Sequence, residues 1–135
     1  MRVLVDTNVL SETVKPRPNA GVLRWLEEHP VFSISAITLE ELAFGIERLQ
    51  GKRRPLLYEW LARLRLEPGP RILAVGEEVA LAAGRLRARR ERKGKSVAQA
   101  DMLIAASALV HGLTLVTRNV RDFDGCGVAL LDPFE

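Results

Sequence analysis

Short apolar runs alternate along the chain with longer stretches in which apolar residues recur at helical spacing. The short runs are β-branched or aliphatic and are bounded by Gly, Pro or polar residues, which is typical of buried strands. They predict strands at residues 3–5, 31–35, 71–75, 113–117 and 128–131. Apolar residues fall at i, i+3, i+4 and i+7 in three longer stretches, which predict helices around residues 39–49, 56–64 and 79–86.

The segment 96–110 is apolar on nearly all sides, which predicts a buried helix, and Gly112 is expected to end it. When strands and helices alternate, the strands are usually parallel and the helices pack on both faces of the sheet. The sequence therefore predicts an α/β fold with a central parallel sheet of about five strands.

Composition is that of an ordinary globular protein, with 135 residues, 47% of them hydrophobic and 27% charged. This length fits a single domain spanning 1–135. No apolar run approaches the roughly 18 residues of a transmembrane helix. The first apolar run meets Asp6 too soon for an export signal, and the single Cys126 excludes an internal disulfide. We therefore expect a cytoplasmic protein with no membrane segment.

Positive charge is concentrated in one part of the chain. The formal net charge is +3, and residues 85–95 hold seven basic side chains against the single acid Glu91. Such a cluster suits a phosphate backbone, and it suits equally well a solvated helix face followed by a loop.

Acidic residues follow the first and fourth predicted strands. In parallel α/β sheets, functional groups gather at the carboxyl ends of the strands. Asp6 comes directly after the first strand; it can also serve as a helix N-cap, but a carboxylate at the end of a central strand is more often functional. Asp122 lies just past the fourth strand, and its neighbour Asp124 is a second candidate; either can be a simple turn acid.

Glu41 lies in the first turns of the helix expected after the second strand. Thr38 and Glu41 have the spacing of a capping box, and the sequence alone favours this capping role. Glu40 is an equal candidate for function, because both acids lie off the apolar face. Gly45 lies one turn beyond Glu41 on the same face, and a side chain there is expected to crowd a cleft.

Asp101 is the most informative acid, because it interrupts a segment in which nearly every neighbour favours burial. A carboxylate in such surroundings is costly to desolvate unless something pairs with it. No basic residue lies three or four positions away on the same helix. Either a metal ion or an arginine from another part of the chain is therefore expected beside it.

Four segments together resemble the motifs of the PIN-domain nucleases, in the same order. They are Val-Leu-Val-Asp-Thr-Asn at 3–8, Ser-x-x-Thr-x-x-Glu-Leu-x-x-Gly at 35–45, Ala-Asp-x-x-Ile-Ala-Ala at 100–106 and Leu-Val-Thr-Arg-Asn-Val-x-Asp-Phe at 115–123. The closing Leu-Asp-Pro-Phe resembles the family's last strand and its Pro–aromatic end. The resemblance covers the whole chain and is strongest to the VapC toxins of toxin–antitoxin pairs.

This resemblance implies a PIN-like α/β/α sandwich and an acidic quartet that serves both catalysis and metal binding: Asp6, Glu41, Asp101 and Asp122. It selects Glu41 over Glu40 and Asp122 over Asp124. Four further residues match polar positions that orient the acids or touch the phosphate: Thr7, Asn8, Thr117 and Asn119. Arg118 and part of the 85–95 cluster are expected to bind flanking phosphates.

Four carboxylates cannot all ionise in one cleft without a cation, because like charges raise one another's pKa values. Oxygen ligands select a hard divalent ion, so we expect Mg²⁺ or Mn²⁺. Asp6 and Asp101 are the expected direct ligands, while Glu41 and Asp122 hold a second ion or position the attacking water. The expected reaction is metal-dependent hydrolysis of RNA.

The resemblance also implies partners, namely an RNA substrate, a VapB-type antitoxin that occludes the site, and a second copy of the chain in a homodimer. Two other readings remain. A haloacid-dehalogenase-like phosphatase needs a second Asp two residues after the first, where this chain has Asn8. A catalytically silent PIN module that binds RNA or protein should have lost one or more of the four acids, and all four are present.

Overall fold

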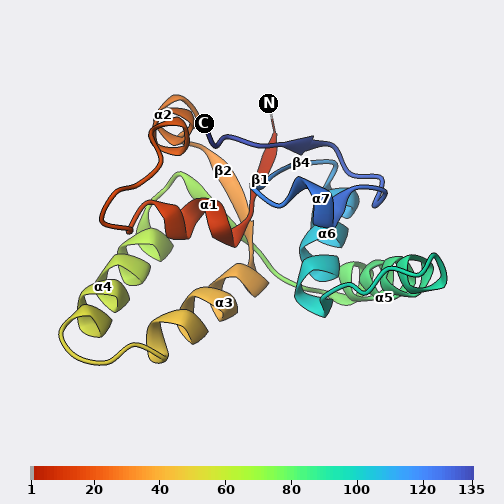
Figure 1. Ribbon diagram of the computed structural model, residues 1–135, viewed down its shortest axis with the longest axis horizontal. Coiled ribbons are helices and arrows are strands. Elements are labelled where there is room, and N and C mark those ends of the chain that lie inside the picture. Colours follow the sequence, from red (N-terminus) through yellow and green to blue (C-terminus); the bar gives the residue numbers. More distant parts are fainter. Residues whose placement is uncertain (1) are drawn as a thin grey trace.

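The computed structural model describes residues 2–135 and contains a five-stranded sheet between two layers of helices (Figure 1). The elements in chain order are β1 (Val3–Val5), α1 (Thr7–Glu12), α2 (Ala20–Glu28), β2 (Phe32–Ser35), α3 (Ala36–Glu47), α4 (Arg53–Leu66), β3 (Pro70–Leu73), α5 (Glu77–Arg92), α6 (Gln99–His111), β4 (Thr114–Val116), α7 (Val120–Phe123) and β5 (Leu130–Leu131). The strand order is β3-β2-β1-β4-β5, and every neighbouring pair is parallel. The predicted α/β/α sandwich with a five-stranded parallel sheet is confirmed.

Strand β1 lies at the centre of the sheet, where Leu4 is paired with Ser33 of β2 and with Leu115 of β4. The pairing of β1 with β4 extends one step beyond the strand, because the backbone N–H of Asp6 donates to the carbonyl of Val116 at 2.9 Å. Asp6 and the residue after Val116 therefore leave the sheet side by side at its carboxyl edge.

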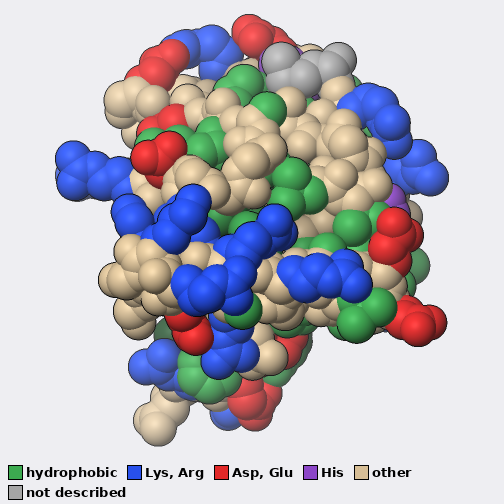
Figure 2. Space-filling model, turned by 90° about the vertical axis from the view of Figure 1, so that its right-hand side faces the viewer, with side chains coloured by type: hydrophobic (Ala, Val, Ile, Leu, Met, Phe, Trp, Pro, Cys, Tyr) green, Lys and Arg blue, Asp and Glu red, His purple; other side chains and the backbone are tan. Residues whose placement is uncertain are grey.

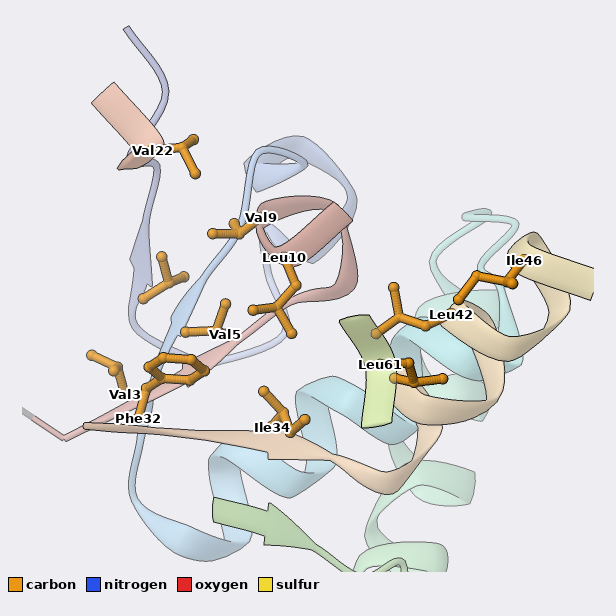
Figure 3. Close-up of a cluster of buried hydrophobic side chains, with 11 residues drawn as sticks. Val3, Val5, Val9, Leu10, Val22, Phe32, Ile34, Leu42, Ile46 and Leu61 are labelled. Atoms are coloured by element: carbon orange, nitrogen blue, oxygen red, sulfur yellow. The ribbon is translucent and has the colours of Figure 1, made fainter. Parts of the chain in front are cut away.

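Successive side chains of β1 enter two different cores, as the alternation of a strand requires. Val3 and Val5 pack with residues of α1, α2, α3 and α4, and Figure 3 shows Leu10, Leu42 and Leu61 converging on this face from three of those helices. On the opposite face, Leu4 joins a second cluster built mainly from α6, with contributions from α5, β4 and α7. The two helix layers are thus anchored through one strand.

Helix α6 is the buried helix predicted from the apolar segment. Six of its residues are buried, namely Met102, Ile104, Ala105, Ala106, Ser107 and Ala108. It ends at Gly112, whose φ of 65° is left-handed, so the predicted terminator is confirmed. Helix α5 packs along α6 and projects from the sheet on the right of Figure 1.

All five predicted strands are found within two residues of their expected ends. Helices α1, α2 and α7 were not predicted, because α1 and α7 span only 6 and 4 residues and show no complete apolar period. Helix α2 follows the proline-rich loop directly and is capped by Asn19, whose side chain accepts from the backbone N–H groups of Gly21 and Val22. No helix within residues 2–135 has the length and apolar character needed to span a membrane.

Candidate active site

Asp6 is the most firmly held of the predicted site residues. Its side chain lies at the end of β1 and is only 4% exposed. Oδ1 accepts from the backbone N–H of Thr7 at 2.8 Å, and Oδ2 accepts from the Thr117 hydroxyl at 2.8 Å and from Asn8 Nδ2 at 3.2 Å. Asp6 is also the N-cap of α1, so the alternative role considered for it is real and coexists with its place in the site.

The pKa of Asp6 is raised above its ordinary value, and the largest cause is burial. The hydrogen bonds from Thr117, Thr7 and Asn8 lower it in part, whereas the negative charge of Asp122 raises it further. The fold therefore orients the Asp6 carboxylate through hydrogen bonds, but it places no positively charged partner beside it among residues 2–135.

Thr117 and Asn8 join the loop after β4 to the start of α1. The Thr117 hydroxyl accepts from Asn8 Nδ2 at 3.3 Å and from the Asn119 backbone N–H at 3.0 Å, while donating to Asp6. The Arg118 backbone N–H donates to Asn8 Oδ1 at 3.1 Å. These polar residues of the first and fourth motifs thus form one network that fixes the orientation of Asp6.

Glu41 joins this network from α3, and the capping box expected for it is wrong. The N-cap of α3 is Ser35, whose hydroxyl accepts from the Ile37 backbone N–H at 3.0 Å, so Thr38 lies inside the helix and is fully buried. Ser35 takes the capping role because the helix begins directly at the end of β2. The Glu41 side chain is left to accept from the Thr7 hydroxyl at 2.6 Å.

The pKa of Glu41 is raised, first by burial and then by the charges of Asp6 and Glu40, while the hydrogen bond from Thr7 opposes this shift. Glu40 itself is exposed to solvent. The geometry thus favours Glu41 over Glu40. The prediction that a side chain at Gly45 would crowd the cleft is wrong for a side chain as small as a methyl group, because a Cβ there would meet no atom within 4 Å.

Asp101 lies in the first turn of α6 and is partly exposed. Within residues 2–135 its side chain takes part in no hydrogen bond or ion pair, so the distant arginine considered as its partner does not pair with it. Its pKa is raised to about 6, chiefly by burial and then by the charges of Asp6, Glu41 and Asp122. All four predicted acids therefore share one electrostatic environment.

Asp122 lies in α7 and is exposed. Together with Asp101 it lines a cavity of about 400 Å³, whose other lining residues include Arg90, Lys95 and Arg121. Asp124 follows the end of α7 and does not line this cavity. Position therefore favours Asp122 over Asp124 as the fourth acid.

The donor set fits a hard divalent cation in chemistry, because every ligand available is a carboxylate oxygen. Among residues 2–135, however, no three Asp, Glu, His or Cys side chains lie close enough together to form a ready cage for a metal. Mg²⁺ is commonly held by one or two carboxylates, with waters and substrate phosphates completing its coordination. Asp101 and Asp122 are the freest ligands, since neither side chain takes part in a hydrogen bond or ion pair among residues 2–135, whereas Asp6 already accepts three hydrogen bonds.

The basic residues predicted to bind phosphate take up two kinds of position. The Arg118 guanidinium lies over the Phe134 ring, 4.7 Å from its centroid. Most basic side chains of the 85–95 cluster are exposed, and Figure 2 shows Lys and Arg gathered across the corresponding face of the molecule. Arg90 alone is buried, and the sequence carried a signal for this, because it continues the apolar face of α5 formed by Ala83 and Leu86.

Comparison with known proteins agrees with this geometry. Residues 3–125 match the family model of the PIN domain. The chain is 39% identical to Toxin FitB of Neisseria gonorrhoeae and 34% identical to VapC ribonuclease Y4jK of Sinorhizobium fredii, each alignment covering 98% of both chains. The crystal structure of FitAcB from Neisseria gonorrhoeae matches with a TM-score of 0.87 at 40% identity, covering 97% of each chain.

A match of this extent leaves the haloacid-dehalogenase-like alternative without support, since both the sequence and the fold agree along nearly the whole chain. The sequence resemblance and the structural match point to the same relatives. The chain therefore belongs to the PIN-domain family and, within that family, is of the VapC type.

Proposed function

We propose that this protein is an endoribonuclease that uses Mg²⁺ or Mn²⁺ to hydrolyse RNA phosphodiester bonds, as the toxin of a type II toxin–antitoxin pair. One observation carries the proposal: the charges of Asp6, Glu41 and Asp122 all act on Asp101. Acids from four separate segments thus lie near enough to one another at the carboxyl edge of the sheet for their charges to repel. The printed names of the relatives, a ribonuclease and a toxin, support the same activity.

The four acids are suited to different tasks. Asp6 is held by three donors, so its remaining acceptor capacity points in a fixed direction. Asp101 has no hydrogen bond among the described residues, so both of its oxygens are available for ligation. A bound divalent cation would supply activation of a water molecule and neutralisation of the charge that develops on the scissile phosphate. Glu41 and Asp122 are assigned to positioning the attacking water or to a second ion.

The polar residues around the acids act mainly by orientation. Thr117 and Asn8 hold Asp6, and Thr7 holds Glu41. Asn119 at the start of α7 and the Arg118 side chain are the groups of this edge proposed to meet the substrate phosphates. We also propose that the protein is a single PIN domain over 1–135, that it acts in the cytoplasm as a homodimer, and that a VapB-type antitoxin inhibits it.

The test combines metal binding with RNA cleavage. Purified protein should bind Mn²⁺ in a titration and should cut a mixture of structured RNAs with Mg²⁺ or Mn²⁺ but not with EDTA. Asp101→Asn should lose both metal binding and cleavage, whereas Asp124→Asn, which changes the charge equally outside the cavity, should keep both. A folded wild-type protein that binds no divalent cation and cuts no RNA would identify the silent PIN module and refute the proposal.

A further inference from the structure

Arg90 is a cation without an anion. Its side chain is only 4% exposed, although its neighbours in the basic cluster are solvated. Within residues 2–135 its Nε has no hydrogen-bond partner, and no carboxylate lies within ion-pair distance. A guanidinium taken out of water is unfavourable unless it is paired and hydrogen-bonded. An anionic ligand beside Arg90 would therefore supply the hydrogen bonds and the opposite charge that the fold does not provide.

Arg90 lines the cavity of about 400 Å³ that also contains Asp101 and Asp122, and it is the one buried residue of that lining. Lys95 and Arg121 line the same cavity and are exposed. The cavity therefore has an acidic part that belongs to the proposed catalytic site and a basic part that this site does not use.

The start of α6 adds a second positive contribution to the basic part. The N-cap of this 13-residue helix is Ala98, which lines the cavity and has no side chain able to cap the helix. The first N–H groups of a helix have no partner within the helix, and they carry a partial positive charge. Backbone groups of this kind bind phosphate readily.

We propose that this cavity binds a phosphate of the RNA backbone adjacent to the one that is cleaved, with Arg90 as its principal ligand. The proposal rests on the proposed function, because the acidic part of the cavity would hold the scissile phosphate with its cation. A free anion would be repelled by Asp101 and Asp122, whereas the next phosphate of a bound strand is delivered by the chain itself. The guanidinium can donate two parallel hydrogen bonds to such a phosphate.

Gly125 leaves room for the guanidinium of Arg90. Its φ of 84° is left-handed, and a Cβ at this position would run into Nη1 of Arg90. Gly127 has nearly the same backbone conformation, with φ of 81°, but a Cβ there would meet nothing within 4 Å. The two glycines thus form a matched pair, in which only the first affects the position of the guanidinium.

The experiment measures binding of a fluorescent single-stranded RNA at a fixed Mn²⁺ concentration over a series of salt concentrations, with every variant made in a Glu41→Gln background to slow cleavage while the cation stays available to Asp101. Arg90→Gln should weaken binding about tenfold or more, because charge-assisted hydrogen bonds are lost. It should also lower the slope of log affinity against log salt by about 0.7, the value of one phosphate contact on a single strand. Arg89→Gln, which removes an exposed charge that does not line the cavity, should weaken binding far less.

The two glycine variants control for the possibility that Arg90→Gln weakens RNA binding only because it misfolds. Gly125→Ala should weaken RNA binding with Arg90 still present, whereas Gly127→Ala, with a similar cost in backbone strain, should bind as the wild type does. RNA affinity that is equal in Arg90→Gln and Arg89→Gln, or equal in the two alanine variants, would overturn the phosphate site. Wild-type protein that binds RNA through Arg90 but never cuts it with Mg²⁺ or Mn²⁺ would refute the nuclease instead.

Discussion

The four acids of the site are held in two different ways. Asp6 and Glu41 are tied by hydrogen bonds from Thr7, Asn8 and Thr117, which reach them from the start of α1 and from the end of β4. Asp101, on the opposite helix layer, and Asp122 have no such partner among residues 2–135, and the pKa of Asp101 is raised by burial first and then by the charges of the other acids. Asp6 and Glu41 thus form a half of the site in which hydrogen bonds fix the carboxylates, which we call the tied half. Asp101 and Asp122 form the other half, in which the carboxylates have no such bonds, and we call it the open half.

This difference shows that orienting a carboxylate and leaving it free to bind a metal ion are competing demands. Hydrogen bonds fix the direction of a carboxylate, but they also use up the lone pairs with which it would bind a metal. Asp6 has given up most of its acceptor capacity in return for a defined position. Asp101 keeps its capacity at the cost of electrostatic repulsion, which either protonation or a bound cation relieves. In the proposed mechanism the tied half therefore sets geometry, while the open half provides the binding energy for the ion.

The largest expected effect comes from removing the anchored acid. Asp6→Asn should lower RNA cleavage by more than about 100-fold, because the loss of a metal-binding carboxylate exceeds the 10- to 100-fold effect of its supporting partners. The measurement is single-turnover cleavage with saturating Mn²⁺, accompanied by circular dichroism to show that the variant is folded.

Glu12 provides the control for burial, because it is only 6% exposed and ends the same short helix. It pairs with Lys15 at 3.0 Å and accepts from the Asn19 backbone, so it holds the proline-rich loop and lies outside the site. Glu12→Gln should lower stability and leave the cleavage rate per folded molecule intact. Cleavage by Asp6→Asn at the wild-type rate would remove Asp6 from the mechanism.

The next largest effect is expected from removing a hydrogen bond that holds Asp6. Thr117→Val keeps the β-branched shape but removes the hydroxyl that donates to Asp6 and accepts from Asn8 and the Asn119 backbone. Cleavage should fall by about 10- to 100-fold, because the orientation of the metal-binding carboxylate is lost. Thr114→Val, in the strand that precedes Thr117 and with no side-chain hydrogen bond to an acid among residues 2–135, should cleave normally. Equal activity of the two variants would show that the network is purely structural.

Much of the open half could be predicted from the sequence. Helix α6 and its end at Gly112 follow from a local apolar pattern and a single glycine. Asp101 is conspicuous because a charge in such a segment has no local partner. Asp6 is conspicuous for a similar reason, at the end of an apolar strand. In each case the signal lies within a few residues, where sequence patterns are informative.

The tied half could not be predicted from the residues alone, because its contacts join distant segments. The hydroxyl of Thr7 reaches Glu41 across 34 positions, and that of Thr117 reaches Asp6 across 111. Local reasoning assigned Glu41 to a capping box, and only the family resemblance selected it for the site. Arg90 was overlooked because its charge suggested solvent, although its spacing from Leu86 places it on the buried face of α5.

A smaller effect concerns stability and pH in the open half. The pKa of Asp101 in the fold, about 6, lies above the ordinary value of 3.8, so ionisation opposes folding. Below pH 4 the group is protonated in both states and has no effect. Between pH 4 and 6 the unfolded chain ionises first, so folding stability is lost as the pH rises, and the loss is constant above pH 6.

Asp101→Asn removes this loss. In EDTA, the free energy of unfolding of the variant minus that of the wild type should increase from pH 4 to pH 6 and then level off, as followed by urea denaturation at each pH. Asp124→Asn, for which no such repulsion is expected outside the cavity, supplies the matched baseline. A difference between Asp101→Asn and wild type that does not vary with pH would show that Asp101 is not strained by the other acids.

The smallest expected effect concerns the space beside the tied half. Gly45 lies in α3 and lines a cavity with Thr7 and Glu41, whereas Gly84 lies in α5, away from the acids. A Cβ meets no atom within 4 Å at either position. Gly→Ala in a helix interior stabilises by about 1 kcal/mol, so both variants should unfold at higher urea concentrations by similar amounts. Because the methyl group at position 45 finds open space, Gly45→Ala should cleave RNA as fast as Gly84→Ala does. Slower cleavage by Gly45→Ala alone would instead mean that substrate passes over α3 on its way to the acids.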